Sequence, residues 1–482
     1  MLSGWLAISV FVAEFVVKFT LIIMILIKRG DKKPSAPLTW IVLILAVPIL
    51  GVFAYLLIGE TRIGRKRIAR HREIISRVHS PAAISIINRP AYSTELPETY
   101  KPIATLAEAV ASNIPLSGNS LKLIGDTDLF IESLVEDIQS AQDHCHLQFY
   151  IFLPDRNGRR IGEALIHSAK KGTLCRLLVD SVGSRNFLNS KLMTQMQEAG
   201  VRIIGALPAN LLRMAFARID LRNHRKIAII DGKVAYTGSH NIADAEFLIK
   251  KRYGPWVDAT VRIVGPAVRD LQTLFIEDWY LDTDEALDGL LEIDPPVISD
   301  GITIQIIGTG PNSYNDALRQ LTQAAFHCAR EELILTTPYF VPDEATAIAL
   351  RTAARQGVDT TLIVPARNDS PLVAAASRSF YEKLLDAGVK IFEYNKGLLH
   401  AKTMTIDRDL AFLSTANLDR RSFELNFEVS IVVYDSDFAS QLRFMQRSYI
   451  EDSTQVDEAV WRNRPWPKVL VHNAVGMVGP LL

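Results

Sequence analysis

Apolar residues are distributed very unevenly along this 482-residue chain. Residues 2–27 and 38–58 are almost wholly apolar, whereas the rest of the chain alternates short apolar and polar stretches. A helix rises about 1.5 Å per residue, so each long run can cross the ~30 Å hydrocarbon layer of a bilayer. A buried core helix or, for the first run, a signal peptide fits this length and composition less well. The sequence therefore predicts a transmembrane helical hairpin over residues 1–60.

Basic residues flank both apolar runs. Four lie in the loop between the runs, and six lie in the exit segment after the second run, which opens an expected linker over residues 61–118. Positive charge favours the cytoplasmic side of a membrane, so this excess places the N-terminus and the body of the chain in the cytoplasm. The exit segment also has the charge to contact anionic headgroups, and the sequence leaves these two roles open.

In the body of the chain, short apolar runs of strand length alternate with amphipathic stretches of helix length. Residues 147–153 and 174–179 are typical of buried strands, and residues 160–170 between them are typical of a helix. Alternation of this kind predicts an α/β architecture in which helices cover a mixed sheet.

This alternation occurs twice with equal spacing. A Pro-Asp pair ends a strand at Asp155 and again at Asp343, and an Ala-Gly-Val turn reaches Val201 and Val389, in each case 46 residues after the Asp. Equal intervals of this length are typical of a duplicated unit. The sequence therefore predicts two α/β lobes packed about a pseudo-twofold axis. Their expected bounds are residues 119–292 and 293–482.

Each lobe contains one copy of the pattern His-x-Lys-x4-Asp, followed ten residues later by Asn. The members are His224, Lys226, Asp231 and Asn241 in the first copy, and His400, Lys402, Asp407 and Asn417 in the second. The His and Lys of each copy are two residues apart on a predicted strand, so their side chains face the same side. Two imidazoles, two ammonium groups and two amides suit a phosphodiester, because they combine proton transfer with binding of anionic oxygens.

The remaining polar residues of the pattern complete the expected site. The aspartates are included in the catalytic set, although their position in hairpin turns favours a structural role. Ser239 and Thr415 lie two residues before the asparagines, and we expect these hydroxyls and amides to bind the substrate phosphate. We also expect Asp258 and Glu428, on matching strands, each to accept a hydrogen bond from a catalytic imidazole. An exposed strand carboxylate is the alternative for each.

The doubled pattern resembles the phospholipase D superfamily, whose active site is built from two His-x-Lys-x4-Asp motifs. The resemblance covers residues 120–450. With the N-terminal apolar runs and the segments 149–155, 338–343 and 417–422, the chain is similar to bacterial cardiolipin synthases over nearly its whole length. It departs from the family pattern at Ser414-Thr415, where Gly-Ser is usual.

The resemblance implies covalent catalysis through a phosphohistidine. His224 is then the nucleophile that attacks phosphorus, and His400 protonates the departing alkoxide and later deprotonates the incoming alcohol. Two identical side chains with these roles must start in opposite protonation states. The lysines supply the positive charge, so the resemblance implies no metal and no cofactor.

The implied function is a membrane-bound phosphatidyltransferase of the bacterial inner membrane. It would use two phosphatidylglycerol molecules, form cardiolipin and release glycerol. Hydrolysis by water, phosphatidylethanolamine as donor and a catalytically silent scaffold are alternatives. A nuclease is disfavoured, because 53 basic residues balance 53 acidic ones and no overall field attracts nucleic acid. The sequence leaves the oligomeric state undetermined.

Three further segments carry weaker signals. An amphipathic insertion at residues 204–217 precedes the first motif and has the character either of a lipid-dipping segment or of an extra surface helix. The C-terminal tail around Trp461 and Trp466 has the residues of a membrane interface or of a loosely packed terminus. His144-Cys145-His146 resembles a metal cluster, but further ligands at useful spacing do not accompany it, so we interpret it as the start of a strand.

Overall fold

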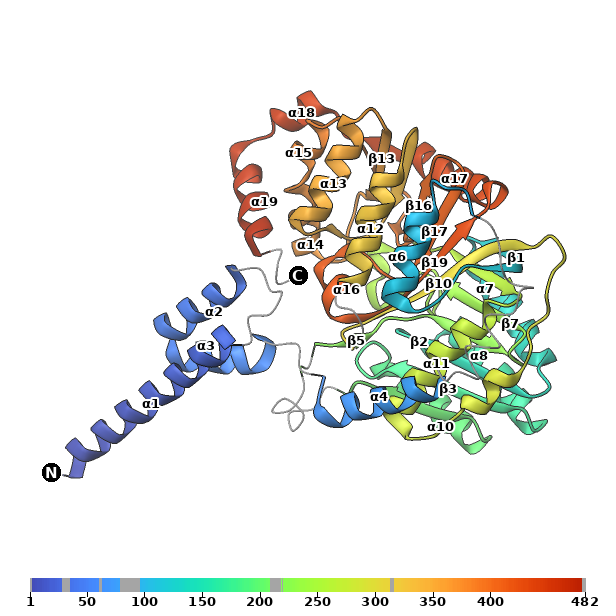
Figure 1. Ribbon diagram of the computed structural model, residues 1–482, viewed down its shortest axis with the longest axis horizontal. Helices are drawn as coiled ribbons and strands as arrows, with labels where there is room; N and C mark the ends of the chain where they lie inside the picture. The colour runs from blue at the N-terminus through green and yellow to red at the C-terminus, as the bar shows by residue number, and fades with distance from the viewer. Residues whose placement is uncertain are drawn as a thin grey trace. The chain divides into compact units, whose positions relative to one another are not determined.

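The computed structural model describes the backbone of residues 2–27, 35–59, 63–78, 96–208, 218, 220–312 and 316–478. The chain divides into two compact units. Unit 1 comprises Met1–Lys66 and Ala209–Leu221, and unit 2 comprises Arg67–Pro208 and Arg222–Leu482. Figure 1 shows both units.

Unit 1 contains three helices from the apolar N-terminal region. α1 (Leu2–Ile27) matches the first predicted span. The second predicted span is not one helix, because the backbone at Val47 leaves the helical conformation between α2 (Ser35–Ala46) and α3 (Pro48–Ala54), with φ −135° and ψ 78°. Proline lacks an N–H and is favoured at the first position of a new helix. A single π-helical turn over Tyr55–Gly59 follows α3.

The helices of unit 1 pack together through a small apolar cluster. Leu21 and Ile25 of α1 contact Ile44 of α2 and Tyr55 after α3. Within the described part of the chain, no helix combines the length and the hydropathy that a membrane crossing requires.

Unit 2 is built on one continuous sheet whose two halves have the same strand order. The first half runs β1 (Leu116–Ile124), β9 (Thr260–Val264), β7 (Val234–Gly238), β6 (Ile227–Ile230), β2 (His144–Phe149), β3 (Leu174–Asp180), β4 (Arg202–Ala206). The second half runs β10 (Ile302–Thr309), β19 (Asn426–Tyr434), β17 (Leu410–Ser414), β16 (Thr403–Ile406), β11 (Glu332–Thr336), β13 (Asp359–Pro365), β14 (Lys390–Tyr394), with β20 (Ser453–Gln455) added at the edge.

The strand directions also repeat. In each half the three outer strands of the shared order are parallel, as in β2, β3 and β4, and the four inner strands are antiparallel. β1 and β10 join the halves as an antiparallel pair that places Leu116 opposite Ile304. The duplicated α/β lobes expected from the equal spacing are therefore confirmed, and their sheets are fused edge to edge.

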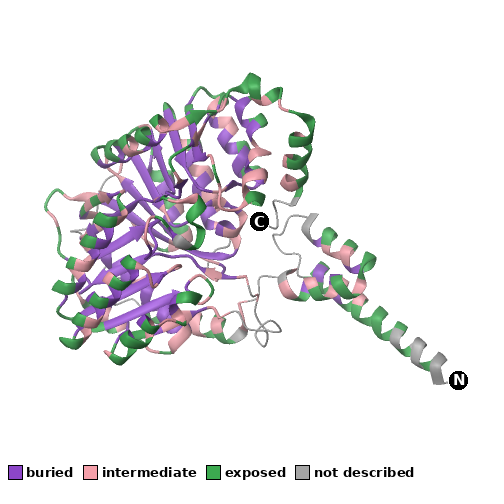
Figure 2. Ribbon diagram, turned by 180° about the vertical axis from the view of Figure 1, so that it is seen from behind, coloured by how far each residue is buried: buried purple, intermediate pink, exposed green. Residues whose placement is uncertain are grey.

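Helices cover both faces of the sheet, because strand side chains alternate between two apolar layers. On β6, Ile227 and Ile229 join one cluster, and Ala228 and Ile230 join another. The first layer is covered by α11 (Val268–Thr283) and α17 (Ser436–Glu451). The second is covered in the first lobe by α7 (Thr127–Ser140), α8 (Arg156–Lys170) and α10 (Lys191–Glu198), and in the second lobe by α12 (Ala317–Cys328), α13 (Glu344–Arg355) and α15 (Tyr381–Leu385). In Figure 2 the strands between these layers are mostly purple, that is, buried.

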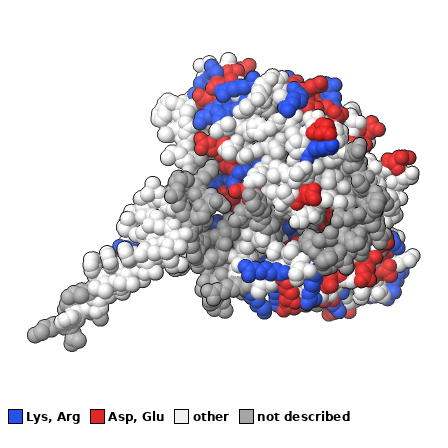
Figure 3. Space-filling model, in the orientation of Figure 1, with Lys and Arg blue, Asp and Glu red and all other residues white. Residues whose placement is uncertain are grey.

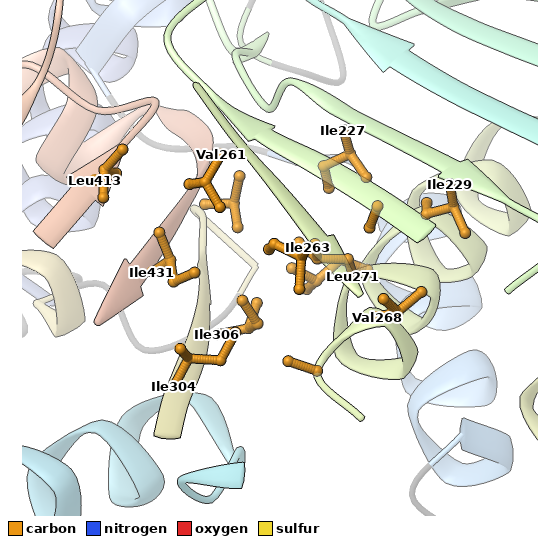
Figure 4. Packing of buried hydrophobic residues seen from close by; sticks show 14 of the residues in the cluster. Ile227, Ile229, Val261, Ile263, Val268, Leu271, Ile304, Ile306, Leu413 and Ile431 are labelled. Carbon is orange, nitrogen blue, oxygen red and sulfur yellow. The ribbon is translucent and has the colours of Figure 1, made fainter. Parts of the chain in front are cut away.

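The first apolar layer runs without interruption from one lobe into the other. Ile304 and Ile306 of β10 and Ile431 of β19 belong to the same buried cluster as Val261 and Ile263 of β9. Figure 4 shows these side chains pointing toward one another across the junction. The lobes therefore share a core, and separating them would expose it to water.

The described part of the expected linker over residues 61–118 includes helical segments. It contains α4 (Arg65–Val78) and α6 (Lys101–Ala111). Ile103 and Ala107 of α6 are buried against the second lobe, although the first lobe follows them in the sequence. Their spacing of four residues was the available signal for an amphipathic helix.

The exit segment has partners within unit 2. Arg67 donates a hydrogen bond to Asp282 at 2.7 Å, and Arg70 donates one to the carbonyl of Leu281 at 3.0 Å and pairs with Asp284. These arginines thus hold α4 against the C-terminal end of α11, a role that the sequence interpretation did not include.

The two motif aspartates hold the turns of their hairpins. The carboxylate of Asp231 accepts hydrogen bonds from the backbone N–H groups of residues 142, 143 and 144, at 2.8–2.9 Å. The carboxylate of Asp407 accepts from those of residues 330, 331 and 332, at 2.7–3.1 Å. Both residues have positive φ, 52° and 51°. They therefore tie each hairpin to the start of the neighbouring strand, which corrects their inclusion in the catalytic set.

Replacing either aspartate by Ala should lower stability before it affects chemistry. Loss of a charged acceptor for three backbone N–H groups should cost about 2–4 kcal/mol of unfolding free energy. Thermal unfolding of Asp231→Ala and Asp407→Ala, with exposed Asp359→Ala as control, measures this loss. Unchanged unfolding temperatures together with lost activity would contradict a structural role.

Candidate functional site

The first motif directly follows a short strand that pairs with a strand of the second lobe. β5 (Arg222–Asn223) pairs in parallel with the start of β19 in the second lobe. The next N–H along the chain, that of His224, donates to the carbonyl of Phe427 at 2.9 Å. A second-lobe strand therefore sets the backbone position of the first-lobe histidine.

The second motif directly follows a short strand that pairs with a strand of the first lobe. β15 (Leu398–Leu399) pairs in parallel with β8 (Trp256–Val257) of the first lobe. The N–H of His400 donates to the carbonyl of Val257 at 2.7 Å. The pseudo-twofold relation between the lobes thus extends to the short strands at the site.

Each histidine is paired with a carboxylate from the opposite lobe. His224 Nδ1 lies 2.8 Å from Glu428 Oε2, and His400 Nδ1 lies 2.6 Å from Asp258 Oδ1. The carboxylates directly follow Phe427 and Val257, so the crossing strands carry them to the rings. Both carboxylates do receive an imidazole hydrogen bond, and the pairing is between lobes, which the sequence pattern did not indicate.

The hydroxyls of Ser239 and Thr415 hydrogen-bond these carboxylates, and phosphate binding by these hydroxyls stays a prediction. The Ser239 hydroxyl donates to Asp258 at 2.6 Å and accepts from the N–H of Ala259 at 2.9 Å. The Thr415 hydroxyl donates to Glu428 at 2.5 Å and accepts from the N–H of Val429 at 3.0 Å. The single hydroxyl proton of each is thereby committed.

The lysines are buried beside the histidines. Lys226 Nζ donates to the carbonyl of His224 at 2.8 Å, and Lys402 Nζ donates to that of His400 at 2.5 Å. Burial lowers the pKa of Lys226 to about 8. Burial lowers the pKa of Lys402 to about 7, and the charge of Lys226 lowers it further against the opposite effect of Asp258. A positive charge on Lys226 therefore disfavours the protonated form of Lys402.

Both imidazoles are neutral at pH 7. Burial lowers the pKa of His224 and of His400 to about 4, outweighing the carboxylates, which act in the other direction. Although burial raises it, the pKa of Glu428 falls to about 2, and that of Asp258 also falls, because the paired imidazoles lower both. The two rings are thus alike at rest, and opposite protonation states in the substrate-bound site stay a prediction.

This arrangement fixes the tautomer of each ring. A neutral imidazole beside an ionised carboxylate donates its Nδ1–H, which leaves a lone pair on Nε2. Two such rings with two ammonium groups provide a nucleophile, a proton carrier and charge for anionic oxygens.

The two half-sites differ in their neighbours. The ring of Tyr150 meets His224 edge-on with centroids 4.8 Å apart, and Trp256 lies 4.5 Å from His400. Arg225, inside the first motif, donates to Asp278 at 3.0 Å and to the carbonyl of Glu428 at 3.1 Å. The second motif has Ala401 at that position. Sequence reasoning missed these neighbours, although the aromatic run before Asp155 was a signal for Tyr150.

The motif asparagines lie beside the Pro-Asp segments of their lobes. Asn241 Oδ1 accepts from the N–H of Ile151 at 3.1 Å. The backbone N–H of Asn417 donates to Ser422 at 3.0 Å, and its buried Oδ1 has no hydrogen-bond partner among the described residues. Binding of phosphate by these amides stays a prediction.

The possible metal cluster at residues 144–146 is part of a strand. His144, Cys145 and His146 lie in β2, where Gln272 hydrogen-bonds both imidazoles at 3.2 and 2.9 Å. Among the described residues, no group of three His, Cys, Asp or Glu side chains is placed to hold a metal ion. Most of the insertion at 204–217 lies outside the described residues.

Comparison with known proteins gives consistent matches over most of the chain. A family model described as cardiolipin synthase, PLD-like domain, matches residues 134–279 and 322–447. A phospholipase D-nuclease N-terminal model matches residues 19–60. The chain is 37% identical over 95% of both chains to cardiolipin synthase A of Edwardsiella ictaluri. It is 37% identical over 92% of both chains to cardiolipin synthase A of Yersinia pseudotuberculosis.

A solved structure shares the fold. Phosphatidylserine synthase from Haemophilus influenzae superposes with a TM-score of 0.60, covering 80% of this chain and 100% of the other at 15% identity. At this identity the likeness concerns the fold alone.

The lowered lysine pKa values predict a pH-dependent anion site. Each lysine is charged below its pKa and neutral above it, so sulfate affinity should fall by about tenfold or more from pH 6 to pH 9. Calorimetric titration with sulfate, which does not titrate in this range, measures the change. The Lys402→Met variant should bind sulfate weakly at pH 6, and its affinity should no longer change near pH 7. The exposed Lys390→Met variant should bind sulfate as the parent does. A parent affinity independent of pH would contradict the argument.

Proposed function

Because the chain belongs to the cardiolipin synthases of the phospholipase D superfamily, we propose that it transfers a phosphatidyl group from one phosphatidylglycerol to a second and releases glycerol. The observation that carries the proposal is the pair of buried histidines, each held by a carboxylate of the opposite lobe, with two buried lysines beside them. Such a site can hold an anionic phosphodiester between a nucleophile and a proton carrier.

In the first step, His224 Nε2 attacks phosphorus and the bond from phosphorus to the glycerol oxygen breaks. The anionic phosphodiester raises the pKa of the nearby His400, so this ring takes up a proton that it delivers to the departing glycerol oxygen. The products are glycerol and a phosphatidyl group bound to His224. Glu428, ionised beside Nδ1, stabilises the positive charge of that ring.

In the second step, His400 Nε2 removes the proton from a hydroxyl of the second phosphatidylglycerol. The resulting oxygen attacks phosphorus, the P–N bond to His224 breaks, and cardiolipin forms. One phosphodiester replaces another, so the proton balance closes without a further reactant. The asparagines 241 and 417 and the two lysines would bind the phosphoryl oxygens in both steps.

We further propose that residues 2–58 attach the enzyme to the bacterial inner membrane. The apolar sequences of α1 and α2 support this attachment, and their packing against each other is compatible with a hairpin. The excess of basic residues after the second apolar run supports a cytoplasmic position for the body. Two spans with this topology are an inference from the sequence.

Product analysis tests the transfer. Purified protein incubated with phosphatidylglycerol alone should form cardiolipin and glycerol in equal amounts. His224→Ala and His400→Ala should each lower the rate by about 10²–10⁴-fold, because each removes a group that bonds to or protonates the reacting atoms. The exposed His167→Ala variant should retain the parent rate. Phosphatidic acid without cardiolipin would favour hydrolysis, and a strict need for phosphatidylethanolamine would change the donor.

Trapping of the covalent intermediate tests the assignment of roles. After rapid quenching of a reaction with phosphorus-labelled phosphatidylglycerol, the acid-labile label should lie on the peptide that contains His224. In His400→Asn the label should persist longer, because no base activates the acceptor. Label on the peptide that contains His400 would reverse the two roles.

A further inference from the structure

The last helix of the chain has two apolar faces. α19 (Trp466–Val478) follows α18 (Glu458–Arg462) and packs through half-buried Val469, His472 and Gly476. The ring of His472 stacks on Trp461 at 6.0 Å, and Gly476 lies so close to Ser379 that a Cβ would meet its hydroxyl. These contacts fix which side of the helix faces unit 2.

The opposite face of α19 is apolar and exposed. The exposed fractions are 74% for Trp466, 59% for Leu470, 54% for Val471 and 84% for Met477. Single exposed apolar residues are ordinary on a protein surface, but several on one helical face form a contiguous patch, which is typical of an interaction site. In Figure 3 the surface over this helix, at the left of unit 2, is mostly white.

The residues of the exposed face suit the boundary between lipid and water. Tryptophan is favoured at the headgroup level, since its ring is apolar and its N–H is polar. A helix that presents large apolar side chains on one face can lie in the plane of a membrane interface.

The position of α19 connects this face to the site. α19 packs on α14 (Pro371–Arg378), and α14 packs on β12 (Phe340–Val341). β12 pairs with β18 (Leu418–Asp419), which directly follows Asn417. α14 and β12 therefore lie between α19 and β18, the short strand that directly follows Asn417.

The residue just before α14 joins the two lobes. Asp369, just before the helix, accepts hydrogen bonds from the hydroxyl of Tyr339 at 2.6 Å and from Lys250 of the first lobe at 2.5 Å. The segment that begins α14 is thus bonded to residues of both lobes.

We propose that the exposed face of α19 is a membrane-docking surface that lies in the headgroup region of a bilayer containing anionic phospholipid. Docking there would bring the rim of the site against the membrane, so that lipid headgroups reach the histidines without leaving the bilayer completely. The proposal rests on the proposed function only in taking lipids as the substrates. It adds an attachment independent of the N-terminal apolar segment.

Spin labelling tests the contact directly. In the full chain carrying Cys328→Ser, with the buried Cys145 and Cys175 kept, a nitroxide is attached at Leu470→Cys or at Phe444→Cys. Phe444 is 78% exposed on α17, which Figure 1 places on the other side of unit 2. In vesicles of phosphatidylglycerol and phosphatidylethanolamine, the label at 470 should collide more with oxygen than with a water-soluble nickel complex. The label at 444 should show the reverse.

Two results would overturn the proposal. Equal exposure of both labels to the nickel complex would show that α19 remains in water. A label at 470 protected from both reagents would show that another part of the chain or a second copy covers the face.

Activity provides the second readout. Leu470→Ser with Met477→Ser should lower the rate on phosphatidylglycerol in vesicles by about tenfold and leave the rate on monomeric short-chain phosphatidylglycerol unchanged. Phe444→Ser should change neither rate. Equal losses on both substrates, or no loss on vesicles, would contradict docking. If the parent forms no cardiolipin from either substrate, the proposed function fails, and the spin labels still decide the docking.

Discussion

The active site depends on two hydrogen bonds between the lobes, one from His224 to Glu428 and one from His400 to Asp258. Neither histidine is completed by its own half of the chain. Each bond needs a short strand that crosses to the other lobe, and each crossing needs the fused sheet and the shared apolar layer that hold the lobes in register. The large core is therefore the condition for a geometry that a few tenths of an ångström would disturb.

Burial of the site controls the protonation of its lysines and histidines. Two lysines inside the protein favour loss of their protons, and their pKa values of about 8 and 7 record that preference. The same burial keeps both imidazoles neutral, so their lone pairs are available. A bound phosphodiester supplies the negative charge that this cluster lacks. The site is thus best satisfied electrostatically when it is occupied.

Much of this architecture follows from local patterns. Equal spacing of the Pro-Asp pairs predicted the duplication, and the two-residue spacing of His and Lys predicted a common face. The crossed pairing was not predictable, because a strand signal at Trp256 or Asn426 does not say which lobe supplies its partner. The hydrogen bonds from Ser239 and Thr415 to the carboxylates were not predictable for a related reason: a hydroxyl beside a motif can serve a substrate or a carboxylate, and only the fold decides. Pro48 divided a run that hydropathy alone presented as continuous.

The edge-to-edge joint between β1 and β10 has a consequence for the origin of the chain. Two identical lobes joined along equivalent edges, with each carboxylate reaching the neighbouring histidine, describe an isologous dimer, in which one interface forms two equal half-sites. A single ancestral lobe could have closed the whole site by associating with a copy of itself. Fusion into one chain then removed the requirement of symmetry, so Arg225 and Ala401, or Tyr150 and Trp256, became free to diverge. In such a chain, compensating substitutions should couple positions across the lobes more than within them.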